Sequence, residues 1–188
     1  MELVLETAAA EIEREGFDKL TTKRIAATAG LSVGALYEYF PNKEAIVHAL
    51  ADSWLQKIRE AIDAPHPRHG GSRDVFAYLD DQFSLVGKLY EHRPGLGALI
   101  PMLTAVPDLA MLVREHDQLV AVNVASALAH HAPHASPAAL DAAARCIGIL
   151  CHDILCAALV HRAAPADLLF ANLRACLVAI ATPLILAR

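Results

Sequence analysis

Apolar residues recur at helical spacing along almost the whole chain, and capping and breaking residues divide that pattern into separate helices. In the first quarter the spacing predicts helices over about residues 2–15, 21–29, 33–40 and 43–62. Gly16 and Gly30 end the first two helices, and Thr21 and Ser32 are N-cap residues for the second and third. Pro41-Asn42 stops the third helix and caps the fourth. Short, tightly joined helices are therefore expected here.

Longer helices follow the segment APHPRHGGSR, residues 64–73, which is rich in Pro, Gly and His and is the clearest linker in the chain. The spacing after it predicts helices over about 72–93, 96–104, 107–130, 137–162 and 166–187. The last two are apolar around most of their circumference. Because hydrophobic residues make up 55% of the chain and aromatic residues only 5%, Ala and Leu dominate, and both favour helix. The expected fold class is all-α.

The net charge of −5 at first argues against a nucleic-acid partner, because neutralising phosphates requires Lys and Arg. The distribution of charge matters more than its sum. Residues 1–18 are strongly acidic, whereas residues 19–43 carry Lys and Arg against a single acid, Glu38. A small basic patch is therefore expected on one motif.

The four cysteines all fall within apolar helical patterns near the C-terminus, at Cys146, Cys151, Cys156 and Cys176. We expect a cytoplasmic protein with reduced cysteines, which serve as small core residues more readily than as redox sensors. The longest apolar stretch, 175–187, is shorter than the roughly 20 residues that span a bilayer. It predicts a buried helix and no membrane association.

Residues 21–40, TTKRIAATAGLSVGALYEYF, have the layout of a helix-turn-helix: a short helix, a tight turn with glycine and a second short helix. Ile25, Ala26, Leu36 and Phe40 face one another across the motif. The outward positions, whose side chains can enter a major groove, are Thr22, Lys23, Val33, Gly34, Ala35, Tyr37 and Tyr39. In the alternative, Tyr37, Tyr39 and Phe40 are core aromatics of a small bundle, but Tyr39 does not easily share a face with the other two.

Residues 16–50 closely resemble the DNA-binding domain of the tetracycline-repressor (TetR) family, in the turn Ala29-Gly30-Leu31-Ser32 and in Leu36-Tyr37-x-Tyr39-Phe40-x-x-Lys43. The resemblance implies a helix-turn-helix domain over 1–48, with its motif at 21–40, and a helical regulatory and dimerisation domain over 49–188. It also implies roles for individual residues in binding DNA. Thr22 and Lys23 contact phosphate or a base edge, Val33, Gly34 and Ala35 form the base-reading tip that Ser32 begins, and Tyr37, Tyr39 and Lys43 bind phosphate.

A single helix-turn-helix buries too little surface for specific binding, so we expect a homodimer on a palindromic DNA operator. The last two helices are the expected interface, since they carry more apolar residues than one chain's core requires. The candidates are Leu140, Ile147, Ile154, Leu155, Leu169, Leu173, Leu177 and Ile180. The alternative is a monomer that buries both helices internally.

The remaining apolar and aromatic residues suggest a site for a small hydrophobic effector, with a few polar groups that point inward. The candidates are Trp54, Phe76, Phe83, Tyr90, Met102, Leu103, Met111, His116, Asn123 and His152. The TetR resemblance implies a pocket between the fourth, seventh and last helices, although a lone His among apolar residues is more often a satisfied core residue.

Two other functions compete with DNA binding in this sequence. Cys151, His152 and Asp153 resemble a catalytic trio in writing, but adjacent helical positions diverge by roughly 100° and their side chains cannot meet, so no enzyme is expected. His130, His131 and His134 span a helix end at a proline, so neither a metal nor a cofactor is expected. The sequence predicts a repressor that an effector releases from DNA; in the alternative, the C-terminal part answers to a protein partner or serves only for dimerisation.

Overall fold

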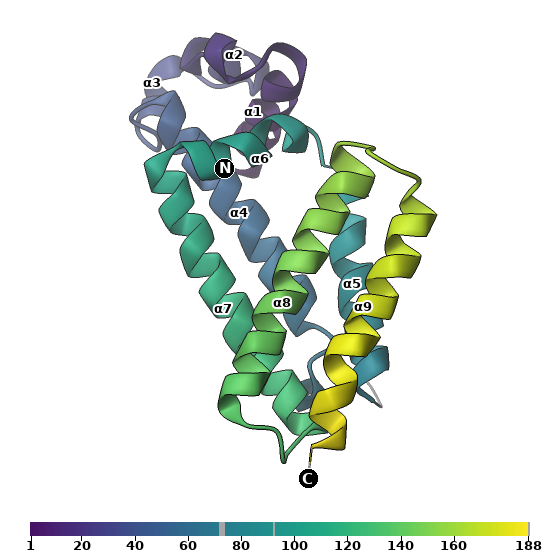
Figure 1. Cartoon of the computed structure of the whole chain (residues 1–188). Coiled ribbons are helices and arrows are strands. Elements are labelled where there is room, and N and C mark those ends of the chain that lie inside the picture. Colours follow the sequence, from purple (N-terminus) through teal and green to yellow (C-terminus); the bar gives the residue numbers. More distant parts are fainter. Residues whose placement is uncertain (72–73, 92, 188) are drawn as a thin grey trace. The chain divides into compact units, whose positions relative to one another are not determined.

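The computed structural model describes residues 1–71, 74–91 and 93–187, and every regular element in these ranges is a helix (Figure 1). The elements are α1 (Glu2–Glu15), η1 (Phe17–Lys19), α2 (Thr22–Thr28), α3 (Val33–Tyr37), α4 (Lys43–Asp63), η2 (Pro67–His69), α5 (Val75–Glu91), α6 (Leu96–Ala105), α7 (Pro107–His131), α8 (Pro137–Leu155), η3 (Cys156–Val160) and α9 (Ala166–Leu186). The predicted all-α fold with nine α-helices is confirmed for the described part of the chain.

Side-chain caps account for where the short helices begin. The Thr21 hydroxyl accepts a hydrogen bond from the N–H of Arg24 at 3.3 Å, and the Ser32 hydroxyl accepts one from Ala35 at 3.0 Å. The Asn42 side chain caps α4 in the same way, through the N–H of Ala45 at 2.7 Å. The three predicted caps are therefore present.

Three helix ends differ from the prediction or fall outside the described residues. The third helix ends at Tyr37, and a turn carries the chain to Phe40. The last part of the eighth predicted helix is a π-helix, η3, after which the chain bends. The predicted start of the fifth helix at Ser72 or Arg73 lies outside the described residues.

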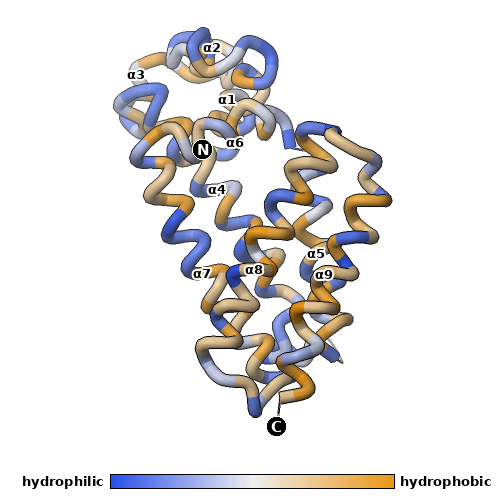
Figure 2. The backbone as a smooth tube through the Cα atoms, in the orientation of Figure 1, coloured by the Kyte–Doolittle hydropathy of each residue, from blue (hydrophilic) through white to orange (hydrophobic). Residues whose placement is uncertain are grey.

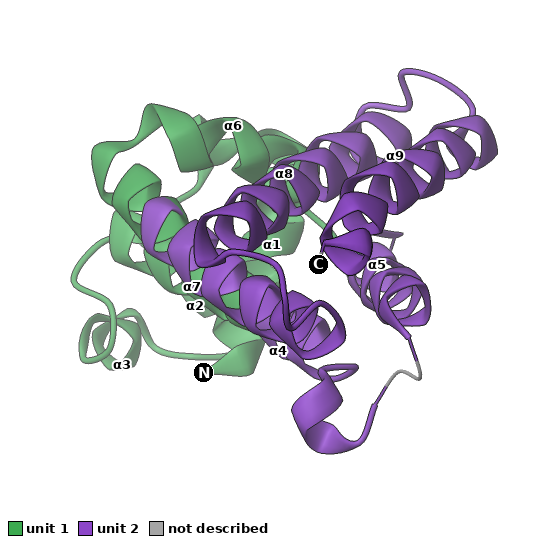
Figure 3. Cartoon of the chain, turned by 60° about the horizontal axis from the view of Figure 1, so that its bottom comes forward, with its two compact units in different colours: residues 1–56, 93–113 green, residues 57–92, 114–188 purple. Residues whose placement is uncertain are grey.

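The chain divides into two compact units (Figure 3). Unit 1 consists of Met1–Gln56 and Arg93–Val113, and unit 2 consists of Lys57–His92 and Arg114–Arg188. Unit 1 thus contains α6 and the first turns of α7 in addition to the N-terminal helices. The division into functional domains near residue 48 stays a prediction.

Unit 1 has a core drawn from each of its helices. Ile12, Ile25, Leu36, Ile46 and Trp54 are all at most 1% exposed. The N-terminus of α6 also lies directly on α1. Gly95 has a φ of +75°, and a Cβ at this position would come within 2.6 Å of the carbonyl oxygen of Ala9. A side chain at residue 95 would therefore separate the two helices.

Unit 2 is built on α5, α8 and α9, which pack against one another. The rings of Phe83 on α5 and Phe170 on α9 meet edge to face, with centroids 5.1 Å apart. Arg174 lies 5.4 Å from the Phe83 ring centroid and also forms an ion pair with Asp80 at 2.5 Å. The contact between α5 and α9 thus has both apolar and charged parts.

The C-terminal helices are more exposed than the sequence suggested. Residues 137–160 and 166–186 are each long and apolar enough to cross a membrane by length and composition, as is the bent pair of α6 and α7 (Figure 2). The expectation that the last helix is buried is wrong, because only 22% of its most apolar window is buried. All four cysteines are free thiols, and the expectation of core positions is also wrong for Cys146 and Cys176, which are exposed.

Candidate nucleic-acid interface and regulatory sites

The turn between α2 and α3 sets the angle of the helix-turn-helix. The N–H of Leu31 bonds to the carbonyl of Ala26 at 2.9 Å, and that of Gly30 bonds to Ala27 at 3.4 Å. Gly30 adopts a φ of +70°, a conformation that residues with a Cβ rarely take. Because α2 stops at this turn, the chain continues directly to the N-cap residue Ser32, and α3 begins at Val33.

The outer side of α3 is open to solvent. Tyr37 is 50% exposed and Tyr39 66%, whereas Phe40 is 6% exposed and belongs to the core with Leu36. The alternative in which both tyrosines are core aromatics is therefore excluded. Ser32, Val33 and Gly34 are also exposed, and Ala35 is half-buried. This end of unit 1 thus presents two phenolic rings beside small side chains.

A hydrogen bond between the two helices of the motif joins two of the predicted DNA-contact residues. The Thr22 hydroxyl and the Tyr37 hydroxyl are 3.0 Å apart, and either oxygen can donate. The bond holds the Tyr37 ring against the start of α2. It links residues 15 positions apart in the chain, so the local sequence gave no sign of it.

Lys43 lies in the first turn of α4, and its ammonium group faces η1. Lys43 Nζ donates to the carbonyl of Phe17 at 3.2 Å and to that of Asp18 at 3.5 Å, and it lies 4.3 Å from the Phe17 ring centroid. An ammonium group has three N–H donors, so one remains for a phosphate. Lys43 therefore also ties η1 to α4, a role that the sequence did not suggest.

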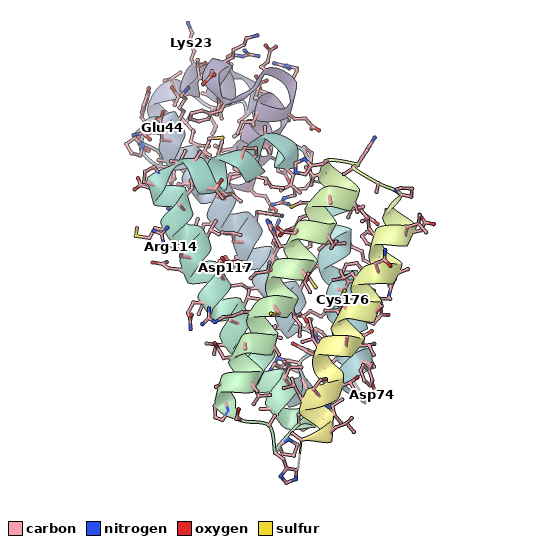
Figure 4. All side chains as sticks on the ribbon, in the orientation of Figure 1. Lys23, Glu44, Asp74, Arg114, Asp117 and Cys176 are labelled. Carbon is pink, nitrogen blue, oxygen red and sulfur yellow. The ribbon has the colours of Figure 1, made fainter. Side chains whose placement is uncertain are left out.

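Carboxylates on α1 neutralise part of the basic patch. Arg24 forms an ion pair with Glu11 at 2.8 Å and with Glu15 at 3.7 Å, and Lys19 pairs with Glu15 at 3.6 Å. Glu11 is 6% exposed and also accepts two hydrogen bonds from Arg14. Lys23, by contrast, is exposed and points away from the ribbon (Figure 4). The positive charge that reaches solvent is thus smaller than the sequence suggested.

The structure separates the predicted interface residues into buried and accessible groups. Five lie in the core of their own chain, with at most 8% exposure: Leu140, Ile147, Leu155, Leu173 and Leu177. Ile154, Leu169 and Ile180 are half-buried. The large apolar residues that α8 and α9 expose are others, namely Ile149, Leu168, Val178, Ile185 and Leu186. The helical periodicity identified these helices as apolar but did not distinguish the inner face from the outer one.

Two of the predicted effector-site residues are in direct contact within unit 2. The Tyr90 hydroxyl lies 2.9 Å from His152 Nδ1, and His152 Nε2 lies 3.7 Å from Cys156 Sγ. Burial raises the pKa of the Tyr90 hydroxyl, and burial also raises the pKa of the Cys156 thiol to about 11. The tyrosine is therefore neutral and the cysteine is a thiol at physiological pH.

His116 is the most strongly perturbed histidine of the candidate site. It is 8% exposed, and its Nδ1 lies 3.3 Å from a guanidinium nitrogen of Arg59. Burial lowers the pKa of His116 to about 4, with smaller contributions from the charges of Arg59 and His152. Because Nδ1 faces the guanidinium donor, the ring is neutral and carries its proton on Nε2.

The other predicted effector residues are distributed over both units. Asn123 belongs to a different contact, since its amide donates to Asp63 at 2.5 Å. Phe83 packs on α9, and Phe76 is 39% exposed. Unit 1 contains the remaining four, of which Trp54 and Leu103 are buried, Met102 is half-buried and Met111 is 53% exposed. A common pocket for the whole set stays a prediction.

Among residues 1–71, 74–91 and 93–187, no group of three or more His, Cys, Asp or Glu side chains is arranged to hold a metal ion. His130 and His131 are neighbours whose ring planes are almost perpendicular, with centroids 5.1 Å apart. Cys151 is not an activated nucleophile, because burial raises the pKa of its thiol to about 12.

Comparison with known proteins identifies the N-terminal segment. Residues 4–50 match the family of bacterial regulatory proteins described as the tetR family. The nucleoid occlusion factor SlmA of Haemophilus ducreyi is 40% identical over 50 residues, which are 27% of this chain and 25% of that protein. The SlmA of Idiomarina loihiensis is 27% identical over 122 residues, 63% of this chain and 55% of that protein. The chain thus spans about a quarter of the length of the first of these relatives.

Solved structures extend the similarity of fold to the whole chain. A TetR-family transcriptional regulator from Syntrophomonas wolfei superposes with a TM-score of 0.77 at 12% identity, covering 100% of this chain and 97% of that one. Another TetR-family regulator, from Streptomyces coelicolor, superposes with a TM-score of 0.73 at 22% identity, covering 95% of this chain and 81% of that one. Beyond the N-terminal segment, these likenesses concern the fold alone.

Proposed function

We propose that the chain is a transcriptional regulator of the tetR family, a homodimeric repressor that reads a palindromic DNA operator and is released by a small hydrophobic effector. The exposed outer side of α3 carries this proposal. Tyr37, the last residue of this five-residue helix, and Tyr39, in the turn that follows it, are open to solvent. Ser32 caps the start of the helix, so the side chains are preorganised for a groove. The proposed location is the cytoplasm, where the operator is.

The operator contacts divide into positioning and reading contacts. Lys23, Tyr37, Tyr39 and the remaining N–H of Lys43 suit phosphates, and the N-terminus of α4 adds the favourable end of a helix dipole. Val33, Gly34 and Ala35 at the tip of α3 have no side-chain hydrogen-bond donors. Contacts with thymine methyl groups and the local shape of the duplex therefore supply much of the specificity.

A second copy of the chain is the proposed partner for the apolar outer face of α8 and α9. Ile149, Leu168, Val178 and Ile185 are each at least 40% exposed, which is unusual for large apolar residues that recur on long helices. A two-fold axis beside these helices would cover the same face in both chains. A dimer carries two reading helices, which is what a palindromic operator requires, because its half-sites repeat roughly 34 Å apart along the duplex.

The proposed effector site in unit 2 is centred on Tyr90, His116 and His152. These three side chains provide polar groups in an apolar surrounding, and His116 and Tyr90 are each at most 8% exposed. The neutral imidazole of His116 and the neutral phenol of Tyr90 suit a mostly apolar molecule that makes one or two hydrogen bonds. An ionised effector would find no opposite charge on either of these two groups.

Fluorescence anisotropy with labelled DNA from upstream of the protein's own gene tests DNA recognition. Tyr39→Ala should lower affinity for every sequence about tenfold or more, because it removes a phosphate contact and exposed ring surface, while the fold remains intact. Tyr39→Phe is the matched variant that keeps the ring and removes only the hydroxyl, so it separates the effect of the hydroxyl from that of the ring surface. Unchanged binding by Tyr39→Ala would contradict the assignment of Tyr39 as a phosphate contact.

The same assay tests release by an effector. Hydrophobic small molecules that raise the melting temperature of the free protein should weaken its binding to the operator, by linkage. If no compound of a broad panel changes either quantity, the regulatory part of the proposal fails. That result would favour a C-terminal unit that responds to a protein partner or serves only for dimerisation.

A further inference from the structure

Four polar side chains form a buried cluster in unit 2 that the sequence did not predict. His66 comes from the turn before η2, Tyr78 from α5, and Asn123 and His131 from α7. The Tyr78 ring lies between the two imidazoles, 6.5 Å from the centroid of His66 and 6.4 Å from that of His131. Asn123 adjoins them through its backbone, which interacts with His66. We call these four residues the polar cluster.

Three members of the polar cluster have a buried polar atom without a hydrogen-bond partner among the described residues. These atoms are the Tyr78 hydroxyl, Asn123 Oδ1 and His131 Nε2. His66 is 3% exposed and Tyr78 is fully buried. An unpaired buried polar atom costs about 1–3 kcal/mol, and folded proteins seldom collect several in one place. A bound group that pairs with them would remove that cost.

The contacts of the cluster determine which of these atoms donate and which accept. His66 Nδ1 accepts a hydrogen bond from the N–H of Arg68 at 3.1 Å, and the ring also has a hydrogen bond with the backbone of Asn123, so both interactions of His66 are made within the protein. The Asn123 amide nitrogen donates to Asp63, which leaves Oδ1 as an acceptor. A hydroxyl such as that of Tyr78 can donate or accept. The polar cluster therefore offers an acceptor and a hydroxyl together.

The polar cluster and the carboxylate beside it provide no unpaired charge for an ionic ligand. Asp63 is the adjoining carboxylate, and it accepts hydrogen bonds from Arg68, His69 and Asn123. The hydrogen bond from Arg68 keeps the pKa of Asp63 well below its usual range, so the carboxylate is ionised and already paired. Burial lowers the pKa of both His66 and His131, which are neutral at physiological pH.

We propose that the polar cluster binds the uncharged hydroxyl or carboxamide group of a small-molecule ligand. A carboxamide fits the pattern most fully, because its oxygen accepts from Tyr78 while its N–H₂ group donates to Asn123 and His131. The site differs from the one centred on Tyr90, His116 and His152. A ligand bound here would extend the proposed effector response. Only the effect of such a ligand on operator binding rests on the proposed function.

Four aromatic probes with one body and different head groups test the site: toluene, benzyl alcohol, benzamide and benzoate. Each is titrated into the full-length protein without DNA, and binding is followed by amide chemical shifts. Benzamide and benzyl alcohol should bind at least threefold more tightly than toluene or benzoate. Equal affinities, tighter binding of benzoate, or no binding of any probe would each overturn the proposal.

Variants show whether the polar cluster causes the preference of the protein for benzamide over toluene. Tyr78→Phe keeps the ring and should lower the benzamide-to-toluene preference about threefold to tenfold without changing the affinity for toluene. His131→Phe, at a half-buried position, should do the same. His161→Phe, at an exposed histidine of unit 2 outside both sites, is the matched control for His131→Phe and should keep the wild-type preference. A preference that survives both cluster variants would assign the probes to another site. Operator binding measured on the same samples separates this result from a failure of the repressor proposal.

Discussion

Unit 1 and unit 2 present their surfaces by different physical means. In unit 1, α2 and α3 are only seven and five residues long, and capping side chains and the Thr22–Tyr37 hydrogen bond hold an exposed polar surface in place. In unit 2, α8 and α9 are 19 and 21 residues long, and packing holds them together while an apolar face stays exposed. Hydrogen bonds thus fix the proposed DNA-reading surface, whereas the proposed surface for association is what packing leaves uncovered.

The largest expected effect concerns the exposed apolar face of α9. Val178 is 47% exposed in the single chain, so Val178→Asp places a charge on the outer face of α9. A two-fold dimer would bring two such charges together. We expect a monomer by sedimentation equilibrium and at least a roughly hundredfold loss of operator affinity, since both half-sites are no longer bound together. Leu119→Asp, at a similarly exposed apolar position on α7, is the control that should remain dimeric. A dimeric Val178→Asp variant would place the interface elsewhere.

The interior of unit 2 should make stability depend on pH. The pKa of His116 is about 4 in the folded chain, below the usual value of 6.5, so protonation favours the unfolded state. Its contribution is complete above pH 6.5 and is lost as the pH falls towards 4, by up to about 3 kcal/mol. Urea unfolding at pH 7 and pH 4.5 measures the loss, which His116→Asn should reduce while keeping an acceptor for Arg59. Equal losses in the two proteins would show that other groups cause the acid sensitivity.

The basic patch of unit 1 should act through few phosphates. Lys23→Ala should reduce the slope of the logarithm of the operator affinity against the logarithm of salt concentration by about one, as for the loss of one phosphate contact. Lys88→Ala, an exposed lysine on α5, removes the same charge and should leave the slope unchanged. Equal effects of both substitutions would indicate a general influence of net charge.

The smallest expected effect tests the bond across the helix-turn-helix. Thr22→Val and Tyr37→Phe each remove one partner, and the double variant completes a thermodynamic cycle. Because the bond is exposed, we expect a coupling free energy of only about 0.5 kcal/mol in operator binding. Thr28→Val, at an exposed threonine later in α2, should show no coupling with Tyr37→Phe. Additive effects of Thr22→Val and Tyr37→Phe would mean that the two hydroxyls act separately on DNA.

Several parts of the fold and the site were predictable because their causes are local. A cap such as that of Ser32 acts over three residues, and the stop at Gly30 needs only a positive φ, so the ends of short helices follow from adjacent residues. The exposure of Tyr39 follows from the same periodicity, since a helix does not easily bury it together with Tyr37 and Phe40. The all-α fold and the exposure of this side of the motif were therefore available from the amino-acid order.

Only the tertiary structure decided which groups meet over long distances in the chain. Lys43 donates hydrogen bonds to two carbonyls that are 26 and 25 residues away, and the Asn123 amide donates one to Asp63, 60 residues away. The inner and outer faces of α8 and α9 were likewise indistinguishable in an almost uniformly apolar pattern, and His66 lay in a segment with the composition of a linker. Burial and pairing depend on which elements come together in space, and helical periodicity contains no information about the neighbour on the other side.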